Sequence, residues 1–257
     1  MPDDILKDLP QRLESMVTLW SLVRVAHDAS GSSASKARNE LVLRYSDATK
    51  NYIRGIVRDE ASAEEIAQNA VLRMLSGDFA GADPNRGRFR DLLKVAARNM
   101  VRNHWAKEKK RRATSLDVES LEDADEAEDV AAWVSNWRQN TLDLTWKALE
   151  KFERSQPRSC AYTLLKLRAS FPDATSDELA ERLSAAVQQK VSPEAARQKL
   201  HRARVKFAEL LVDEIADGLQ LPSADDIEAE LVALGLIEYV RKLLPPEWKE
   251  LRDQPAE

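Results

Sequence analysis

The sequence predicts an all-α fold, organised as two small helical domains joined by an acidic linker. The first observation is composition: Ala, Leu, Glu, Arg and Lys are abundant and only seven of 257 residues are Gly, which favours helix over sheet. The second is that apolar residues recur at helical spacing between stretches rich in Pro, Gly or Ser. The third is a run of acidic residues near the middle of the chain, which separates two groups of such segments.

The N-terminal domain is predicted to span residues 16–112, after a polar lead-in at residues 1–15. Residues 16–27 form a short amphipathic pattern, and residues 36–58 form a longer one after a Ser/Gly-rich break. Both patterns predict helices that bury one face and expose the other.

The next helix is predicted from its end signals. Ser62 stands three residues before Glu65, which is the spacing of a capping box, and Gly77 suits the end of the helix. The apolar positions between them define a buried face, and the polar side chains left over are Gln68, Asn69 and Arg73. The segment 77–87 holds Pro and Gly and is predicted to be a loop.

A strongly basic stretch, residues 86–112, ends this domain. It carries eleven Lys or Arg against two acids, although the whole chain has a net charge of −5. Residues 88–107 have helical spacing, and Lys94, Arg98 and Arg102 fall on one stripe of that helix. The amide and aromatic residues set into the same segment are Phe89, Asn99, Asn103 and Trp105.

Two interpretations of the basic stretch remain open. Positive charge neutralises phosphates, Asn pairs with base edges, and aromatic rings stack on unpaired bases. This mixture suits single-stranded or opening nucleic acid. Alternatively, the charges form a solvated face and Trp105 is a packing residue of the core.

The segment 113–137 is predicted to link the two domains. Residues 117–129 hold eight acids and no base, with little apolar content, which is typical of a flexible chain. Helical patterning returns near Trp133 and continues to about Glu153, and Pro157 breaks it.

The second domain is predicted to span residues 138–217 and to end in two helices joined by a short turn, after a helix at 159–170. Thr175 and Glu178 form a capping box for the first of the pair. Ser192, followed by Pro193, starts the second, which runs to about residue 216. This pattern is typical of a helix-turn-helix, with an ordinary helical hairpin as the alternative. The side chains suited to base edges and phosphates are Arg197, Gln198, Lys199, His201 and Arg202.

Residues 218–257 form a C-terminal extension. Residues 224–244 alternate apolar and acidic positions as an amphipathic helix does, with the apolar set Leu231, Leu234, Ile237, Val240 and Leu244. Two interpretations remain: this helix covers the second domain, or it binds a regulator.

The sequence offers no features of an enzyme. A single cysteine, Cys160, excludes an internal disulfide, and three scattered histidines offer no metal site. Because no phosphate-binding Gly loop and no nucleophile–base set is present, we expect no enzymatic activity and no cofactor. The N-terminus is acidic and no apolar run is long enough to cross a membrane, so we expect a cytoplasmic protein without membrane insertion.

Taken in order, these segments resemble the extracytoplasmic-function group of bacterial RNA polymerase sigma factors over about residues 17–217. The blocks that carry the resemblance are TLWSLV at 18–23, AEEIAQNAVLRML at 63–75, GRFRDLLKVAARNMVRNHW at 87–105, SDELAERL at 176–183 and SPEAARQKLHRAR at 192–204. Their order and spacing, with the acidic linker between them, are more specific than any single block.

The resemblance implies a transcription initiation subunit that has core RNA polymerase and promoter DNA as partners. Residues 16–112 correspond to sigma region 2 and residues 138–217 to sigma region 4. The implied contacts with the polymerase clamp are Gln68, Asn69 and Arg73. The implied contacts with the −10 element are Phe89, Lys94, Arg98, Asn99, Arg102, Asn103 and Trp105. The implied contacts with the −35 element are Ala195, Arg197, Gln198, Lys199, His201 and Arg202.

Three further expectations follow from the resemblance. The acidic linker lies near the path of the nascent RNA, unless it is a plain solubilising tether. An anti-sigma factor or another regulator is a possible further partner. The family commonly has an acid where this chain has Asn69. That difference favours an alternative, a helix-turn-helix transcriptional regulator that does not bind core polymerase.

Overall fold

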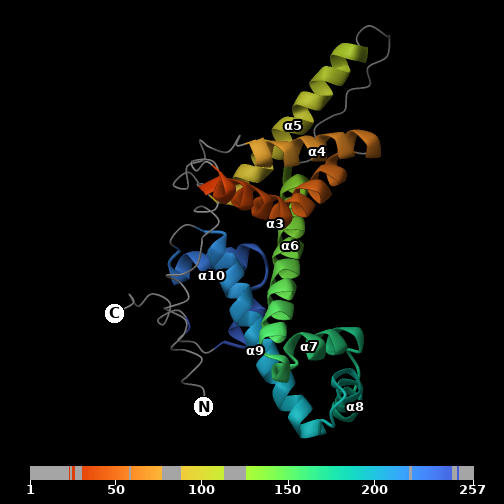
Figure 1. Cartoon of the computed structure of the whole chain (residues 1–257). Coiled ribbons are helices and arrows are strands. Elements are labelled where there is room, and N and C mark those ends of the chain that lie inside the picture. The colour runs from red at the N-terminus through yellow and green to blue at the C-terminus, as the bar shows by residue number, and fades with distance from the viewer. Residues whose placement is uncertain are drawn as a thin grey trace. The chain divides into compact units, whose positions relative to one another are not determined.

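The computed structural model describes residues 23, 25–26, 31–57, 59–76, 88–112, 126–219, 222–244 and 248. Within these ranges the chain forms helices and the turns between them, without a strand, so the all-α prediction is confirmed (Figure 1). No helix in these ranges is long and apolar enough to cross a membrane. The predicted lead-in, the loop at 77–87 and the acidic residues 113–125 lie outside the described residues.

The chain divides into two compact units. The N-terminal unit holds the described residues up to Asn140 together with Ala216–Asp226, and the C-terminal unit holds Thr141–Ile215 and the described residues from Ile227 onward. Helix α6, Glu126–Ser155, contributes residues to both units.

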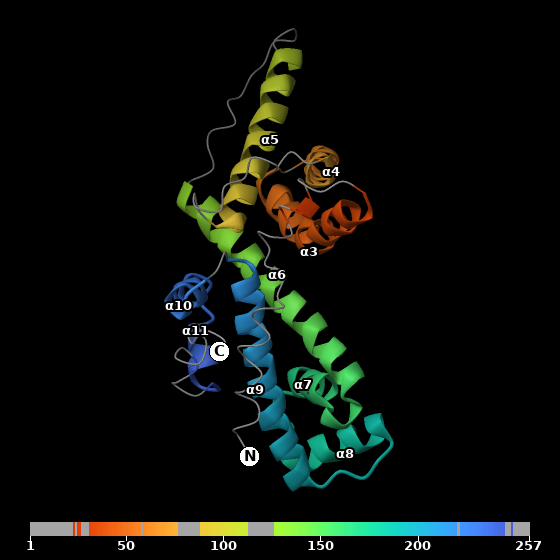
Figure 2. The ribbon, with the colours of Figure 1, turned by 60° about the vertical axis from the view of Figure 1, so that its left-hand side comes forward.

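Helices α3 (Ser32–Ile56), α4 (Glu60–Ser76) and α5 (Phe89–Arg112) build the N-terminal unit with the first half of α6. Figure 2 shows α3 and α4 side by side, with the C-terminal half of α5 extending past both. Helix α3 begins earlier than the predicted 36–58. Of the predicted first helix, 16–27, only residues 23, 25 and 26 are described, and all three are helical.

Two tryptophans attach the start of α6 to this unit. The ring of Trp137 stacks on Tyr45 with centroids 5.1 Å apart, and that of Trp133 meets Tyr52 edge-on at 4.8 Å. Both indoles are buried. The prediction that residues 113–137 form a linker is therefore wrong for 126–137, because these residues belong to helix α6, and Trp133 and Trp137 pack on α3.

Helix α4 begins two residues before the predicted cap. The Asp59 carboxylate accepts a hydrogen bond from the backbone N–H of Ser62 at 2.7 Å, which is the N-cap interaction. Ser62 therefore lies inside the helix, and the predicted capping box with Glu65 is wrong. Asp59 and Ser62 were both candidates for the N-cap, and Asp59 is the residue that caps the helix.

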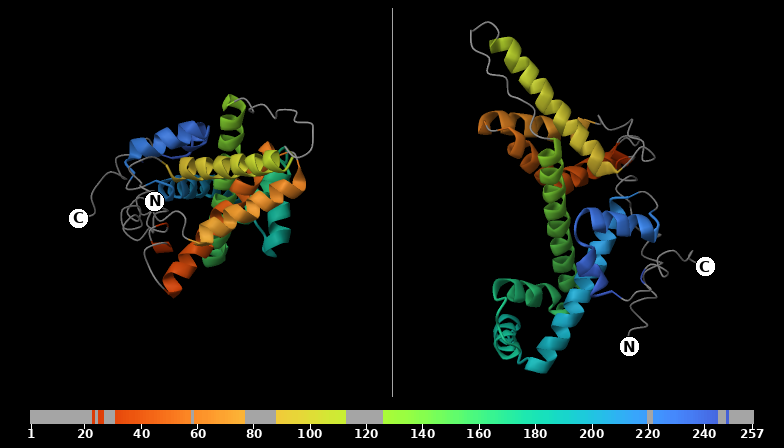
Figure 3. Two further views of the ribbon diagram at one scale, coloured as in Figure 1. Left: turned by 90° about the horizontal axis from the view of Figure 1, so that it is seen from above. Right: turned by 180° about the vertical axis from the view of Figure 1, so that it is seen from behind.

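The C-terminal unit contains the second half of α6, a short 3-10 turn at Pro157–Ser159, α7 (Ala161–Ser170), α8 (Ser176–Val187) and α9 (Pro193–Asp217) as far as Ile215. Figure 3 shows these helices from two further sides, with α7 beside α8. Their common core includes Leu149, Leu164, Leu183, Leu200 and Phe207. The break of α6 before Pro157 is confirmed.

The C-terminal extension forms two helices, α10 (Ala224–Ala233) and α11 (Ile237–Arg241), where the sequence predicts one. The break lies at Gly235, which has a φ of +68°. The N–H of Leu236 bonds to the carbonyl of Leu231 at 2.8 Å, as in a Schellman cap. Tyr239 meets Phe207 edge-on at 5.8 Å, so this segment covers the C-terminal unit, as the packing interpretation predicts.

Candidate nucleic-acid interfaces

Helix α5 has one buried and one exposed face. Its buried side chains include Leu93, Ala97 and Val101, which recur every four residues. Asn99, Arg102 and Asn103 are exposed, and Lys94 and Arg98 are half-buried. The helix therefore presents an amide-rich and cationic face, as the spacing predicts.

Phe89 does not belong to this face. Its side chain is 1 % exposed, and its ring packs edge-on against Tyr45 at 5.4 Å. The prediction that Phe89 contacts DNA is wrong for this structure, because the first turn of α5 uses the ring to attach the helix to α3. Arg90 is buried as well, with Nε 3.7 Å from an Asp91 carboxylate oxygen, so the basic stretch exposes less charge than its composition suggests.

Trp105 and the end of α5 lie beyond the apolar face. Trp105 is half-buried, so part of its indole packs and part stays accessible. Lys107, Lys110 and Arg111 are exposed, and Glu108 pairs with Arg111 at 3.0 Å. This end of the helix combines a partly accessible indole with several cations.

Helix α4 exposes the three residues that the sequence singles out. Gln68, Asn69 and Arg73 are exposed, and the Gln68 side-chain amide donates to Glu64 at 3.5 Å. Between them lies Leu72, which is 59 % exposed and which the sequence analysis missed. The sequence could have indicated this exposure, because Leu72 does not share the four-residue spacing of the buried Ile66, Ala70 and Met74.

Helices α8 and α9 form the predicted pair, and their caps follow the sequence. The backbone N–H of Thr175 donates to the Glu178 carboxylate at 2.7 Å, and the N–H of Glu178 donates to the Thr175 hydroxyl at 3.3 Å. The first of these bonds, followed by the Thr175 hydroxyl, lowers the pKa of Glu178. Ser192 accepts from the N–H of Ala195 at 3.2 Å, so both predicted caps are confirmed.

The turn between α8 and α9 is held by local hydrogen bonds. Gln188 ends α8 in the left-handed conformation, with a φ of 53°. The Ser184 hydroxyl donates to the Ala180 carbonyl at 2.6 Å and accepts from the N–H of Val191 at 2.9 Å. These contacts fix the direction in which α9 leaves the turn.

Helix α9 presents most of its predicted contact residues to solvent. Ala196, Leu200 and Ala203 are buried. The exposed members of the predicted set are Arg197, Gln198, His201 and Arg202, and the half-buried members are Ala195 and Lys199. Lys199 is held by the carbonyl of Arg158 in the 3-10 turn.

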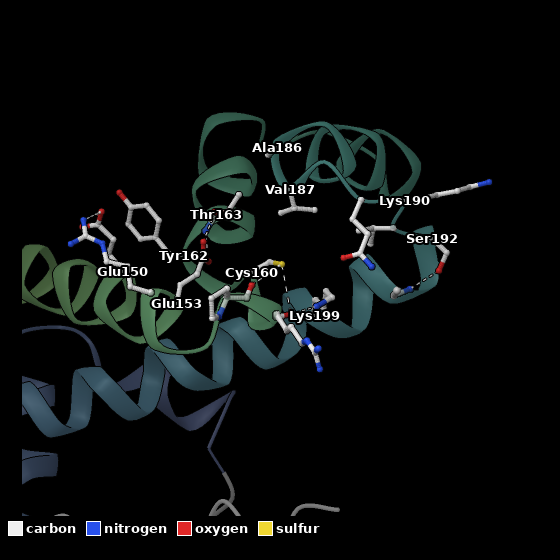
Figure 4. A pocket seen from close by; sticks show the side chains of 16 residues that line it. Glu150, Glu153, Cys160, Tyr162, Thr163, Ala186, Val187, Lys190, Ser192 and Lys199 are labelled. Carbon is white, nitrogen blue, oxygen red and sulfur yellow. Dashed lines mark hydrogen bonds and ion pairs between the residues drawn. The ribbon is translucent and has the colours of Figure 1, made fainter.

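An open groove of about 1290 Å³ adjoins the start of α9 (Figure 4). It lies between the end of α6, the start of α7 and the turn after α8, and Ala195 and Lys199 line one side. Arg158 and Lys190 also line the groove, and the sequence analysis missed both; the Lys190 side chain extends away from the groove (Figure 4). Their positions in the sequence could have identified them, because Arg158 follows the helix-breaking Pro157 and Lys190 lies in the turn before α9.

The acids of the groove are engaged in local contacts. Glu153 accepts from the N–H of Thr163 at 2.9 Å and from its hydroxyl at 2.6 Å, which caps the first turn of α7. Glu150 pairs with Arg154 at 2.7 Å. Cys160 lies beneath them at 6 % exposure, with a φ of 53°, and its thiol donates to the Pro157 carbonyl at 3.5 Å.

No family model, curated protein or solved structure matches this chain. Among the described residues, no three His, Cys, Asp or Glu side chains cluster in a way that could hold a metal ion. Functional assignment therefore rests on the residues and their arrangement.

Proposed function

We propose that the chain is a sigma factor of the extracytoplasmic-function group, which binds core RNA polymerase, recognises −10 and −35 promoter elements and directs transcription initiation. The observation that supports this most is that each of two compact units presents one helix with an exposed face of cationic and amide side chains, α5 in one and α9 in the other. A regulator that reads a single duplex site needs only one such face.

In this proposal α9 reads the −35 element as a duplex. A recognition helix places its N-terminal residues against base edges, and Arg197, Gln198 and Arg202 are exposed in the first three turns of α9. Arg pairs with guanine and Gln with adenine in the major groove. The groove beside them adds Arg158 and Lys190 as phosphate contacts.

Helix α5 serves the −10 element, where strands separate. Extruding a base costs a few kcal/mol, which polar contacts and stacking can offset. The exposed Asn99, Asn103 and Arg102 supply the polar contacts, and the accessible part of Trp105 supplies a stacking surface. Phe89 has no part in this because its ring lies in the core.

The exposed face of α4 contacts the polymerase clamp in this proposal. Leu72 provides the apolar centre of that contact, and Gln68, Asn69 and Arg73 provide its polar rim. The second candidate is a helix-turn-helix regulator without polymerase contact, and Asn69, in place of the common acid, is the observation that favours it.

Co-elution with core polymerase separates the two candidates. The purified chain is mixed with bacterial core RNA polymerase, from its own source where available, and the mixture is run on a sizing column. A stable complex that initiates run-off transcription supports the sigma factor. No complex with matched core polymerase contradicts it and leaves the duplex-binding regulator.

A variant of α4 makes the test specific. We expect Leu72→Asp to weaken the complex at least about tenfold, because a charge at the centre of a packed interface stays desolvated. Val232→Asp is the matched control, since Val232 is 55 % exposed and lies on α10. Equal affinity of the two variants would show that α4 is not the polymerase contact.

A further inference from the structure

Glu194 lies in the first turn of α9, among the predicted base-reading residues, and its side chain is 64 % exposed. The resemblance to sigma factors assigns it no contact. Its carboxylate nevertheless binds two members of the predicted set. One oxygen pairs with the Arg197 guanidinium, and the other accepts from the Gln198 side-chain amide at 3.4 Å.

We propose that Glu194 is a specificity-determining residue of α9, which orients Arg197 and Gln198 toward base edges and opposes their use as phosphate contacts. This inference rests on the proposed function, because it requires that α9 enters a major groove. It adds to that function a residue, Glu194, that sets the preference of α9 for specific over random DNA.

The physical basis is the difference between the two kinds of DNA contact. A guanidinium that is free to swing finds the nearest phosphate, which adds affinity for every sequence alike. A guanidinium held by a carboxylate keeps a fixed direction and still has donors left for a guanine edge. The carboxylate also repels phosphates and can accept a hydrogen bond from cytosine. Each of these effects raises the ratio of specific to random binding.

The chain contains a matched control for this pair. Glu238 pairs with Arg241 at the same spacing of three residues, and its side chain is 69 % exposed. It lies on α11, away from the predicted contact residues of α9. Glu194→Gln and Glu238→Gln thus remove the same charge from an exposed ion pair of the same spacing, and only the first touches the proposed reading surface. Arg241 keeps a second partner, Glu228, at 3.1 Å, so Glu238→Gln controls for the lost charge.

The test begins with selection from a pool of random duplexes of about 30 base pairs, using the full chain alone and in complex with bacterial core polymerase. The affinity of each variant is then measured for the selected duplex and for the unselected pool. We expect Glu194→Gln to lower the ratio of these affinities about threefold to tenfold, through tighter binding to the pool and lost preference at one or two adjacent base pairs. We expect Glu238→Gln to leave the ratio unchanged.

Other outcomes separate this inference from the proposed function. If the wild type selects a sequence and Glu194→Gln keeps the same ratio, the inference is wrong and the proposed function stands. The inference also fails if Glu238→Gln lowers the ratio equally. If the wild type selects no sequence in either format, both are wrong.

A measurement without DNA tests the orientation directly. In NMR relaxation of arginine side chains, the Arg197 Nε–H should be more mobile in Glu194→Gln than in the wild type. Equal mobility would show that the carboxylate does not hold the guanidinium.

Discussion

At the scale of single residues, burial decides which of the predicted side chains are available to a partner. Phe89 and Arg90 stand in the basic stretch but lie in the core, and Leu72 is apolar but lies in solvent. Residue type alone therefore misplaces all three. Trp133 lies within the predicted linker, but its side chain is buried, with 1 % exposed.

Trp133 is expected to be the main anchor of the first half of α6. Trp133→Ala should lower the free energy of unfolding of the N-terminal unit by about 3–5 kcal/mol, as buried aromatic truncations do. Urea unfolding followed by far-UV circular dichroism measures the loss. Val130→Ala on the same helix is the control, since Val130 is 45 % exposed and the change should stay within about 0.5 kcal/mol. Equal losses would mean that α6 is not anchored through Trp133.

At the scale of helices, end signals and periodicity predicted α5, α8 and α9 well, because caps and faces depend on residues close in sequence. They failed at the start of α4, where two residues could cap the helix, and at the start of α6, where the packing partners are distant in sequence. The start of α6 is acidic and is held by rings from α3, which no local pattern reveals. The extension keeps a helical period across Gly235, so its break depends on one backbone conformation.

The faces of the candidate interfaces were predictable for the same reason. A helix with one apolar stripe exposes the opposite side, so Asn99, Arg102 and Arg202 could be placed from spacing alone. The groove beside α9 could not, since it is formed by segments from α6, α7 and the turn after α8.

In the turn between α8 and α9, Gln188 has a strained left-handed backbone conformation that a glycine would relieve. A side chain in the left-handed region costs about 1–2 kcal/mol, and glycine avoids that cost while adding freedom to the unfolded chain. Gln188→Gly should therefore raise the free energy of unfolding of the C-terminal unit by up to about 1 kcal/mol. Thermal unfolding measures the change. Gln189→Gly is the control, because the neighbouring residue has no positive φ and should lose stability.

At the scale of the whole molecule, the two interfaces belong to different compact units. Arg102 and Arg202 represent them, one exposed on α5 and one on α9. In the proposed function each contacts a different promoter element, so their contributions to binding should be independent.

Independence can be measured with the complex of the chain, core polymerase and a promoter that carries both elements. Arg102→Ala and Arg202→Ala should each weaken binding by about 1–3 kcal/mol, and the double variant should lose the sum within about 0.5 kcal/mol. Lys36→Ala and Lys242→Ala, on exposed positions of the two units, control for lost charge. A double variant no weaker than either single variant would place both side chains on one element.

Labelling of the single, buried thiol can measure how often the C-terminal unit opens. Cys160 is the single cysteine of the chain and is 6 % exposed in the C-terminal unit, where it lines the groove, so a thiol reagent reacts with it when local or global opening exposes the thiol further. At saturating reagent the labelling rate equals the opening rate, and at low reagent it reports the population of the open state. The labelling rate is followed by mass spectrometry with and without duplex DNA. A slower rate with DNA gives the extent to which DNA binding suppresses opening of the unit that carries α9.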